Sequence, residues 1–141
     1  MDSNQTHSES AEHASQPIEI PLPADVRAPG EARGFVRERL PELGEDVLDD
    51  VTLIVSELVS NAVQHGQPDI VLRMIVEPLS IDVSVLDHGT TVPSRDVQVP
   101  METATSGRGL SIVDRLASDW GVLPLEPGRG KHVWARLKVG D

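Results

Sequence analysis

The sequence predicts an α+β domain: a two-layer α/β sandwich with helices on one face of a mostly antiparallel mixed sheet. Segments with helical and strand character follow one another as strand, helix, helix, hairpin, loop, helix, hairpin. The longest of them, Glu45 to Gly66, carries apolar residues at helical spacing, whereas the hairpin segments alternate apolar and polar residues. Amphipathic helices and half-buried strands in this order favour helices layered on a sheet.

The first segments of the chain read as a tail, a short strand and a helix. Residues 1–16 offer almost nothing to bury, so we expect a disordered N-terminal tail and one domain over residues 17–141. Residues 18–22 form a short strand, and Pro21 predicts an edge position. Residues 28–40 form a helix with Pro29 in its first turn.

The predicted helix from Glu45 ends at Gly66 and carries an unusual polar edge. Glu57, Asn61 and His65 recur every four residues and therefore stack along one edge of the helix. A carboxylate and an amide bordered by valine and leucine must be hydrogen-bonded or must hold a ligand. Solvent alone wets many such edges, so this row needs support from other parts of the chain.

The next two segments, residues 69–76 and 80–86, predict a hairpin joined by a turn at Glu77-Pro78. Ile81, Val83 and Val85 share one face of the second strand, and Asp87 is next in that series. If the apolar face lies against the helices, Asp87 points into the interface between sheet and helices. A lone acid at that position needs a hydrogen-bond donor.

A long loop over residues 90–106 has no sustained periodicity, and its length indicates a functional or mobile segment. A glycine-led helix is expected over residues 107–119, with Trp120 continuing its apolar stripe. Two further strands, residues 121–126 and 131–139, form a second hairpin.

Composition excludes several classes of protein. A net charge of −11 argues against nucleic-acid binding and against a helix held on anionic lipid. No cysteine is present, so disulfides and thiolate metal sites are excluded. No apolar run is long enough to span a membrane, and the N-terminus lacks the features of a signal peptide, so we expect a cytoplasmic protein. Aromatic residues make up only 2% of the chain, which predicts a core of Val, Leu, Ile and Ala.

Other motifs in the chain are weak by themselves. Glycines at a helix start, as in Gly107-Arg108-Gly109-Leu110, favour anion binding, although the dinucleotide fingerprint is excluded because Ile112 replaces its third glycine. Asp-x-Gly is common in turns. A metal triad of the dispersed histidines matches no local ligand spacing and is the less favoured interpretation. The sequence has no nucleophile elbow.

Together these motifs resemble the GHKL, or Bergerat-type, ATP-binding fold, and in particular the anti-sigma-factor serine kinases and single-domain ATP-binding regulators of actinobacteria. The resemblance covers about residues 26–139. Four motifs carry it, in this order: Glu57 to Val63 for the N-box, Asp87-His88-Gly89 and Gly107-Arg108-Gly109-Leu110 for the two glycine boxes, and Gly130-Lys131-His132-Val133-Trp134 for the final strand.

The resemblance implies a role for each matching residue. Glu57 would be the catalytic base, or would orient the attacking group, and Asn61 would bind Mg²⁺ and nucleotide. Asp87 would accept a hydrogen bond from the adenine amino group, with Gly89 leaving room for the ring.

The glycine-led segment would form the phosphate part of the site. Gly107, Arg108, Gly109 and Leu110 would cradle the ATP phosphates under a lid formed by residues 90–106. This lid lacks the extra glycines that many members of the family carry.

The implied function is phosphorylation of a serine on an antagonist partner protein, with a sigma factor as a further partner and a homodimer left open. A non-catalytic module that sequesters a sigma factor is the alternative. The family usually has Thr or Ser where His132 stands, which predicts weaker nucleotide binding, although strand alternation places His132 with Trp134 and Arg136. A sensor histidine kinase is disfavoured, because no second domain or phosphoacceptor helix pair is evident.

Overall fold

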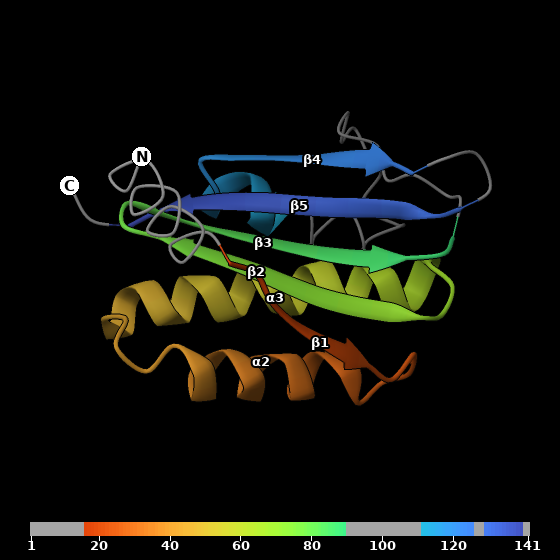
Figure 1. The fold of residues 1–141 in the computed structure, drawn as a ribbon, viewed down its shortest axis with the longest axis horizontal. Coiled ribbons are helices and arrows are strands. Elements are labelled where there is room, and N and C mark those ends of the chain that lie inside the picture. The colour runs from red at the N-terminus through yellow and green to blue at the C-terminus, as the bar shows by residue number, and fades with distance from the viewer. Residues whose placement is uncertain (1–15, 90–110, 126–128, 140–141) are drawn as a thin grey trace, which may run out of the picture.

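A computed structural model describes residues 16–89, 111–125 and 129–139. Figure 1 shows a sheet with helices packed beside it. The elements, in chain order, are β1 (Ile18–Leu22), α2 (Ala28–Arg39), α3 (Glu45–His65), β2 (Ile70–Glu77), β3 (Ser80–Asp87), β4 (Asp119–Pro124) and β5 (Lys131–Lys138). Residues 111–116 are also helical. The predicted tail, residues 1–16, lies outside the described residues except for Gln16.

The described strands form one sheet in the order β1-β2-β3-β5-β4, and each neighbouring pair is antiparallel. β1 lies at the edge, as Pro21 predicts. The β2–β3 hairpin has the expected partners, with Val76 opposite Ile81. The order places β3 in the centre of the sheet, between β2 and β5, where α3 packs on it.

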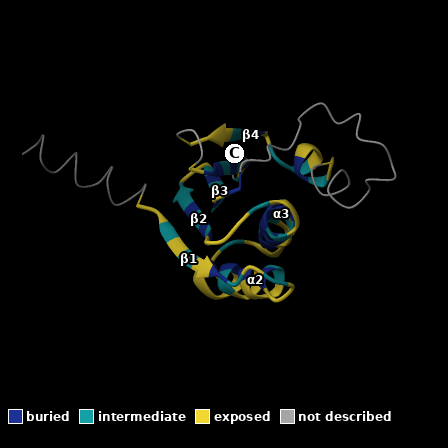
Figure 2. Ribbon diagram, turned by 90° about the vertical axis from the view of Figure 1, so that its right-hand side faces the viewer, coloured by how far each residue is buried: buried dark blue, intermediate teal, exposed yellow. Residues whose placement is uncertain are grey.

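The helices lie on one side of the sheet, which confirms the predicted α+β class (Figure 2). The core between the two layers contains Ile54, Val55 and Val59 of α3 against Leu72 and the other inward residues of the sheet. Aliphatic side chains fill most of this core, as the low aromatic content predicts. Trp120 is the one aromatic side chain that is fully buried among the described residues.

The α3 helix begins and ends close to where its sequence predicts. Glu45 and Asp46 lie in its first turn, where negative charge complements the helix dipole. At its other end the Gly66 N–H donates to the Ala62 carbonyl at 2.8 Å. Its apolar stripe lies on the sheet, so the polar edge that includes Asn61 is carried into the interface between the layers.

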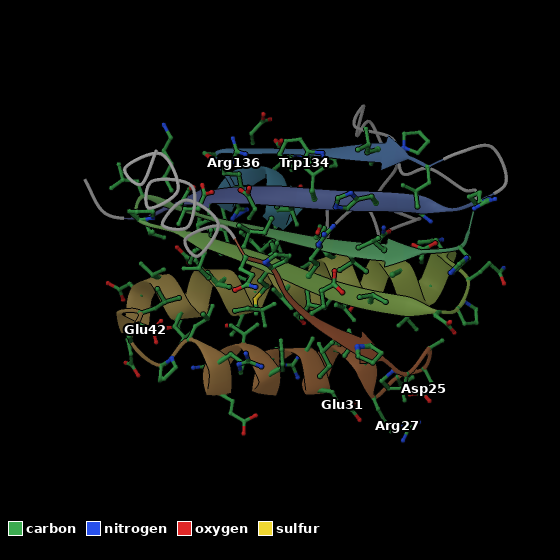
Figure 3. All side chains as sticks on the ribbon, in the orientation of Figure 1. Asp25, Arg27, Glu31, Glu42, Trp134 and Arg136 are labelled. Atoms are coloured by element: carbon green, nitrogen blue, oxygen red, sulfur yellow. The ribbon has the colours of Figure 1, made fainter. Side chains whose placement is uncertain are left out.

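An ion pair marks the entrance to α2. Asp25 and Arg27 lie side by side there (Figure 3), with Arg27 Nη2 at 2.8 Å from Asp25 Oδ2. The side-chain hydrogen bond from Arg27 lowers the pKa of Asp25 to about 2. Both side chains are exposed, so we expect little net stability from this pair.

The predicted helix over residues 107–119 is wrong at its C-terminal end. The described part is helical over residues 111–116, and β4 already begins at Asp119. Ser118 N–H donates to the Arg136 carbonyl at 2.8 Å, which joins the chain to β5 before the expected helix end. Trp120 is therefore a strand residue, and sheet pairing overrides its helical spacing.

In the described part of the chain, no helix is long and apolar enough to cross a membrane.

Candidate functional site

The polar edge of α3 passes from the surface into the interior. Glu57 is half-buried, Asn61 is only 5% exposed, and His65 is exposed at the helix end. Neither Oδ1 nor Nδ2 of Asn61 has a hydrogen-bond partner within the described residues. A buried amide without partners costs free energy, so these atoms point to a ligand or to ordered water.

Asp87 is the last residue of β3 and is 2% exposed, as the alternation along that strand predicts. Its Oδ1 accepts two hydrogen bonds, from the Gly89 N–H at 2.6 Å and from Lys131 Nζ at 3.0 Å. Its Oδ2 is buried and has no partner in the described part of the chain. One oxygen of this carboxylate is therefore committed to the protein, and the other is left available as an acceptor.

Two glycines let the end of α3 approach this carboxylate. A Cβ atom on Gly66 would lie 2.5 Å from Asp87 Cγ, and one on Gly89 would lie 2.9 Å from Gly66 Cα. The His88 N–H donates to the Gln67 carbonyl at 2.9 Å, which joins the end of β3 to the segment after α3. Any larger residue at either glycine would push the two segments apart, so the site depends on both.

Lys131 contacts Asp87, although sequence reasoning placed it in the final-strand motif without assigning it a role. It is the first residue of β5, lies opposite Asp87 in the strand register, and is fully buried. The sequence does contain a signal for the burial of Lys131. Strand alternation places it on the same face as Val133, Ala135 and Leu137, the face that the helices cover. The preceding Gly130 has φ +112°, and a side chain there would collide with the Asp87 carbonyl and His88 Cα.

His132 lies on the other face of β5, away from Asp87. Its register partner is Leu86, and it is half-buried, as is Trp134 two residues along on that face. Burial, and then the charge of Arg73, lower the pKa of His132, which favours its neutral form. His132 therefore does not contact Asp87, and a weakening of nucleotide binding by this histidine could not act through that carboxylate.

The carboxyl group of Glu57 on α3 has a shifted pKa. Partial burial beside apolar neighbours raises the pKa of its carboxyl. A raised carboxyl pKa brings proton uptake closer to neutral pH, which suits a general base.

The other expected site residues lie outside the described residues. Gly107, Arg108, Gly109 and Leu110 belong to this group, as does the loop of residues 90–106. The helical residues 111–116 follow directly, and Trp120 Nε1 donates to Asp114 Oδ1 at 2.7 Å, which ties this helix to β4. No cluster of three or more His, Asp or Glu side chains that could hold a metal ion occurs among the described residues.

The described site residues fit a nucleotide bound with a divalent cation. The Asn61 amide supplies a carbonyl oxygen, a ligand type that Mg²⁺ accepts. Asp87 Oδ2 supplies an acceptor for an amino group. The Asn61 amide and Asp87 Oδ2 are buried and have no hydrogen-bond partner within the described residues, as expected of groups that bind a ligand.

Comparison with known families shows the family to which this chain belongs. The family described as histidine kinase-like ATPase domain matches residues 22–137. The chain belongs to this histidine kinase-like ATPase family. The match includes α3, β3 and β5, the elements on which the site lies. Membership in a family of ATPase domains implies that this chain binds ATP.

Two solved structures resemble this histidine kinase-like ATPase domain. A chain of the SiaB-SiaC complex from Pseudomonas aeruginosa matches with a TM-score of 0.61 and 13% identity, over 95% of this chain and 97% of that one. The Acinetobacter baumannii histidine kinase AdeS matches with a TM-score of 0.49 and 11% identity, over 99% and 77% of the two chains. At these identities the first likeness shows the fold, and the second carries no further argument.

Proposed function

We propose that this protein is an ATP- and Mg²⁺-binding regulator of the anti-sigma-factor kinase type, which phosphorylates a serine on an antagonist partner protein. The observation that carries the proposal is the set of buried polar atoms on Asn61 and Asp87 that have no partner among the described residues. Family membership supports ATP as the ligand. The identity of the partner class rests on the sequence resemblance.

Asp87 is proposed to read the nucleobase. Its free Oδ2 would accept a hydrogen bond from the adenine 6-amino group, while the Gly89 N–H and Lys131 hold Oδ1 and so fix the carboxylate plane. Gly66 and Gly89 keep the wall of the site free of side chains beside this carboxylate. A flat ring then meets backbone and a single oriented acceptor.

Asn61 is proposed to bind the cation through its amide oxygen, with Nδ2 free to donate to a phosphate oxygen. Bound Mg²⁺ would neutralise charge on the phosphates during transfer. Gly107, Arg108, Gly109 and Leu110 are proposed as the phosphate cradle, a role that rests on the resemblance of the Gly-Arg-Gly-Leu motif.

Glu57 is proposed as the proton acceptor. The serine oxygen forms a bond to the γ-phosphorus as the bond to the leaving ADP oxygen breaks, and the hydroxyl proton passes to the Glu57 carboxylate. Glu57 lies one helical turn before Asn61 on the same edge of α3, which supports a position beside the phosphates. Its raised pKa favours proton uptake in this step.

A partner protein is part of the proposal. The solved structure with the higher TM-score is that of a two-protein complex, SiaB-SiaC, and the chain of it that matches is covered almost completely. This supports a regulator that acts on another protein. We propose an antagonist protein or a sigma factor as that partner, and a homodimer stays open.

Radiolabelled ATP and candidate antagonist proteins would test phosphotransfer. We expect a labelled serine on one partner with the wild-type protein and none with the Asn61→Ala variant. The exposed neighbour Gln64→Ala is the matched control and should label the partner as the wild type does. Equal labelling by Asn61→Ala and wild type would exclude this mechanism.

The second candidate is a non-catalytic module that sequesters a sigma factor. The buried Asp87–Lys131 ion pair favours it, because it satisfies part of the carboxylate without any ligand. Calorimetry distinguishes the two functions. No heat on titration with ATP and Mg²⁺ up to millimolar concentration would favour the non-catalytic module.

A further inference from the structure

Lys131 is a buried cation at the point where β5 meets the end of β3. Its side chain is 1% exposed, and its Nζ lies 3.0 Å from Asp87 Oδ1. Within the described residues the Lys131 ammonium makes one hydrogen bond, to Asp87 Oδ1. An ammonium carries three N–H donors. Donors therefore remain for another acceptor in a place that the protein has already desolvated.

The Asp87 carboxylate is used unevenly. Oδ1 accepts from both Lys131 Nζ and the Gly89 N–H, whereas Oδ2 has no partner in the part of the chain that the structure describes. One free acceptor therefore lies beside a cation that still has donors. This arrangement is complementary to a flat ligand edge that presents one amino group next to one unprotonated ring nitrogen.

Adenine has such an edge, since its 6-amino group donates and the neighbouring N1 accepts. Guanine and hypoxanthine present a carbonyl at position 6 and an N–H at N1. With position 6 of the ring at Asp87 Oδ2 and position 1 at Lys131 Nζ, guanine would set its carbonyl oxygen against the carboxylate and its N1–H against the ammonium. In that orientation the pair favours adenine over guanine.

We propose that Lys131 is a specificity residue that donates a hydrogen bond to N1 of adenine while Asp87 Oδ2 accepts from the 6-amino group. This inference rests on the proposed nucleotide function, because it concerns the same site. It adds a direct base contact from β5. A buried ion pair contributes little net stability, so stability alone is a weak reason for a lysine at this position.

Titration calorimetry with ADP, 1-deaza-ADP and GDP, each with Mg²⁺, tests the contact. In 1-deaza-ADP a C–H replaces N1, and the 6-amino group is kept. Wild-type protein should bind 1-deaza-ADP on the order of ten- to a hundredfold more weakly than ADP, since a hydrogen bond from a charged donor is lost. GDP should bind more weakly still.

The Lys131→Met variant should bind ADP and 1-deaza-ADP within about twofold of each other, because the donor to N1 is gone. Lys131→Gln keeps an N–H donor without the charge, and should retain part of the preference. Lys138→Met, at an exposed position on the same strand, is the matched control and should discriminate as the wild type does.

Three outcomes overturn the inference. Equal discrimination by Lys131→Met and wild type would make the ion pair purely structural, with water or another group at N1. If Lys131→Met fails to fold, Lys131→Gln and the wild-type series decide, and equal wild-type affinity for ADP and 1-deaza-ADP contradicts the contact. Absence of any ADP binding by the wild type is a separate result that removes the proposed function itself.

Discussion

At Asn61, α3 buries an amide whose oxygen and nitrogen both lack partners among the described residues. Leaving one such group unpaired in a protein interior costs roughly 1–3 kcal/mol. An apolar residue would fit this position on the helix better if stability were the only requirement. We therefore interpret Asn61 as a residue whose cost in the free protein is offset when ligand binds.

The Asn61→Ala variant should separate stability from binding. Because the Asn61 side chain has no hydrogen-bond partner within the described residues, we expect the free energy of unfolding to fall by no more than about 1 kcal/mol, or to rise. Binding of ADP with Mg²⁺ should be lost. Urea denaturation and calorimetry measure the two quantities, with Gln64→Ala as the exposed control. A stability loss well above about 2 kcal/mol would mean that the amide is satisfied in the free protein.

Glu57 gives a pH prediction whose sign follows from its raised pKa. The folded state binds this proton more tightly than the unfolded state, so ionisation of Glu57 destabilises the fold as pH rises past the ordinary value of 4.5. Glu57→Gln should therefore be more stable than wild type at pH 7, and the difference should shrink toward pH 4. Thermal denaturation across this range measures it, and a constant difference would contradict the assignment.

The same pKa predicts the pH dependence of the proposed phosphotransfer. Only the ionised carboxylate accepts the serine proton, so the rate should rise with pH through the raised pKa of Glu57 and then level off. On the high-pH plateau Glu57→Gln should lower the rate by about a hundredfold or more, and the difference should shrink as the pH falls below the pKa of Glu57. A variant that keeps the wild-type rate and pH profile would exclude Glu57 as the base.

Among single residues, the sequence predicted the inward position of Asp87 but not its partner. Alternation along residues 80–86 was sufficient for Asp87 because its neighbours on that face are all aliphatic. Lys131 obeys the same rule on β5, yet a lysine beside Pro-Gly-Arg-Gly reads as an exposed turn residue. Only the pairing of β3 with β5 brings the two charges together, and strand pairing depends on contacts distant in sequence.

Among the elements, the turn into β5 carries the sharpest stability prediction. Gly130 has a backbone conformation that other residues rarely adopt, and a methyl group there meets the backbone of Asp87 and His88. Gly130→Ala should cost about 2 kcal/mol or more. Gly34→Ala, in α2 with open space around it, should instead gain about 0.5–1 kcal/mol. Equal effects of the two substitutions in urea denaturation would contradict this geometry.

The helix of residues 111–116 is joined to the sheet by a hydrogen bond from Trp120 Nε1 to Asp114. Asp114→Ala removes the acceptor of a buried indole N–H and should cost about 1–2 kcal/mol. The exposed neighbour Arg115→Ala should be nearly neutral, which makes it the control. Tryptophan fluorescence, to which Trp120 and Trp134 both contribute, is the readout, and an unaltered spectrum with unaltered stability would mean that this bond does not hold the helix.

Most elements could be predicted because their signal is local. The bounds of α3 follow from its long apolar stripe and its terminal glycine, and those of β2 and β3 from aliphatic residues that recur at every second position. The predicted helix end at residue 119 is wrong because Trp120 continues the helical spacing by coincidence. There, hydrogen bonds from Ser118 to the Arg136 carbonyl begin a strand, and no local pattern reveals them.

For the molecule as a whole, the proposed site lies where α3, β3 and β5 meet, three elements far apart in the chain. The fold class and the family could be inferred from the order of motifs, and residues 22–137 match the histidine kinase-like ATPase family. The strongly acidic chain, with a net charge of −11, repels nucleotide phosphates at long range. We therefore expect binding to depend on Mg²⁺, and to weaken sharply when the cation is chelated.

The most direct measurement is a calorimetric titration of the wild type and Asn61→Ala with ATP, each with Mg²⁺ and again with excess chelator. Asn61 is proposed to be the cation ligand at a site built from buried atoms that lack partners within the described residues. The wild type should therefore bind with Mg²⁺ and much more weakly with chelator, and the variant, shown to be folded by urea denaturation, should bind in neither condition. Equal binding by both proteins, or no binding by the wild type at millimolar ATP, would contradict the proposed site.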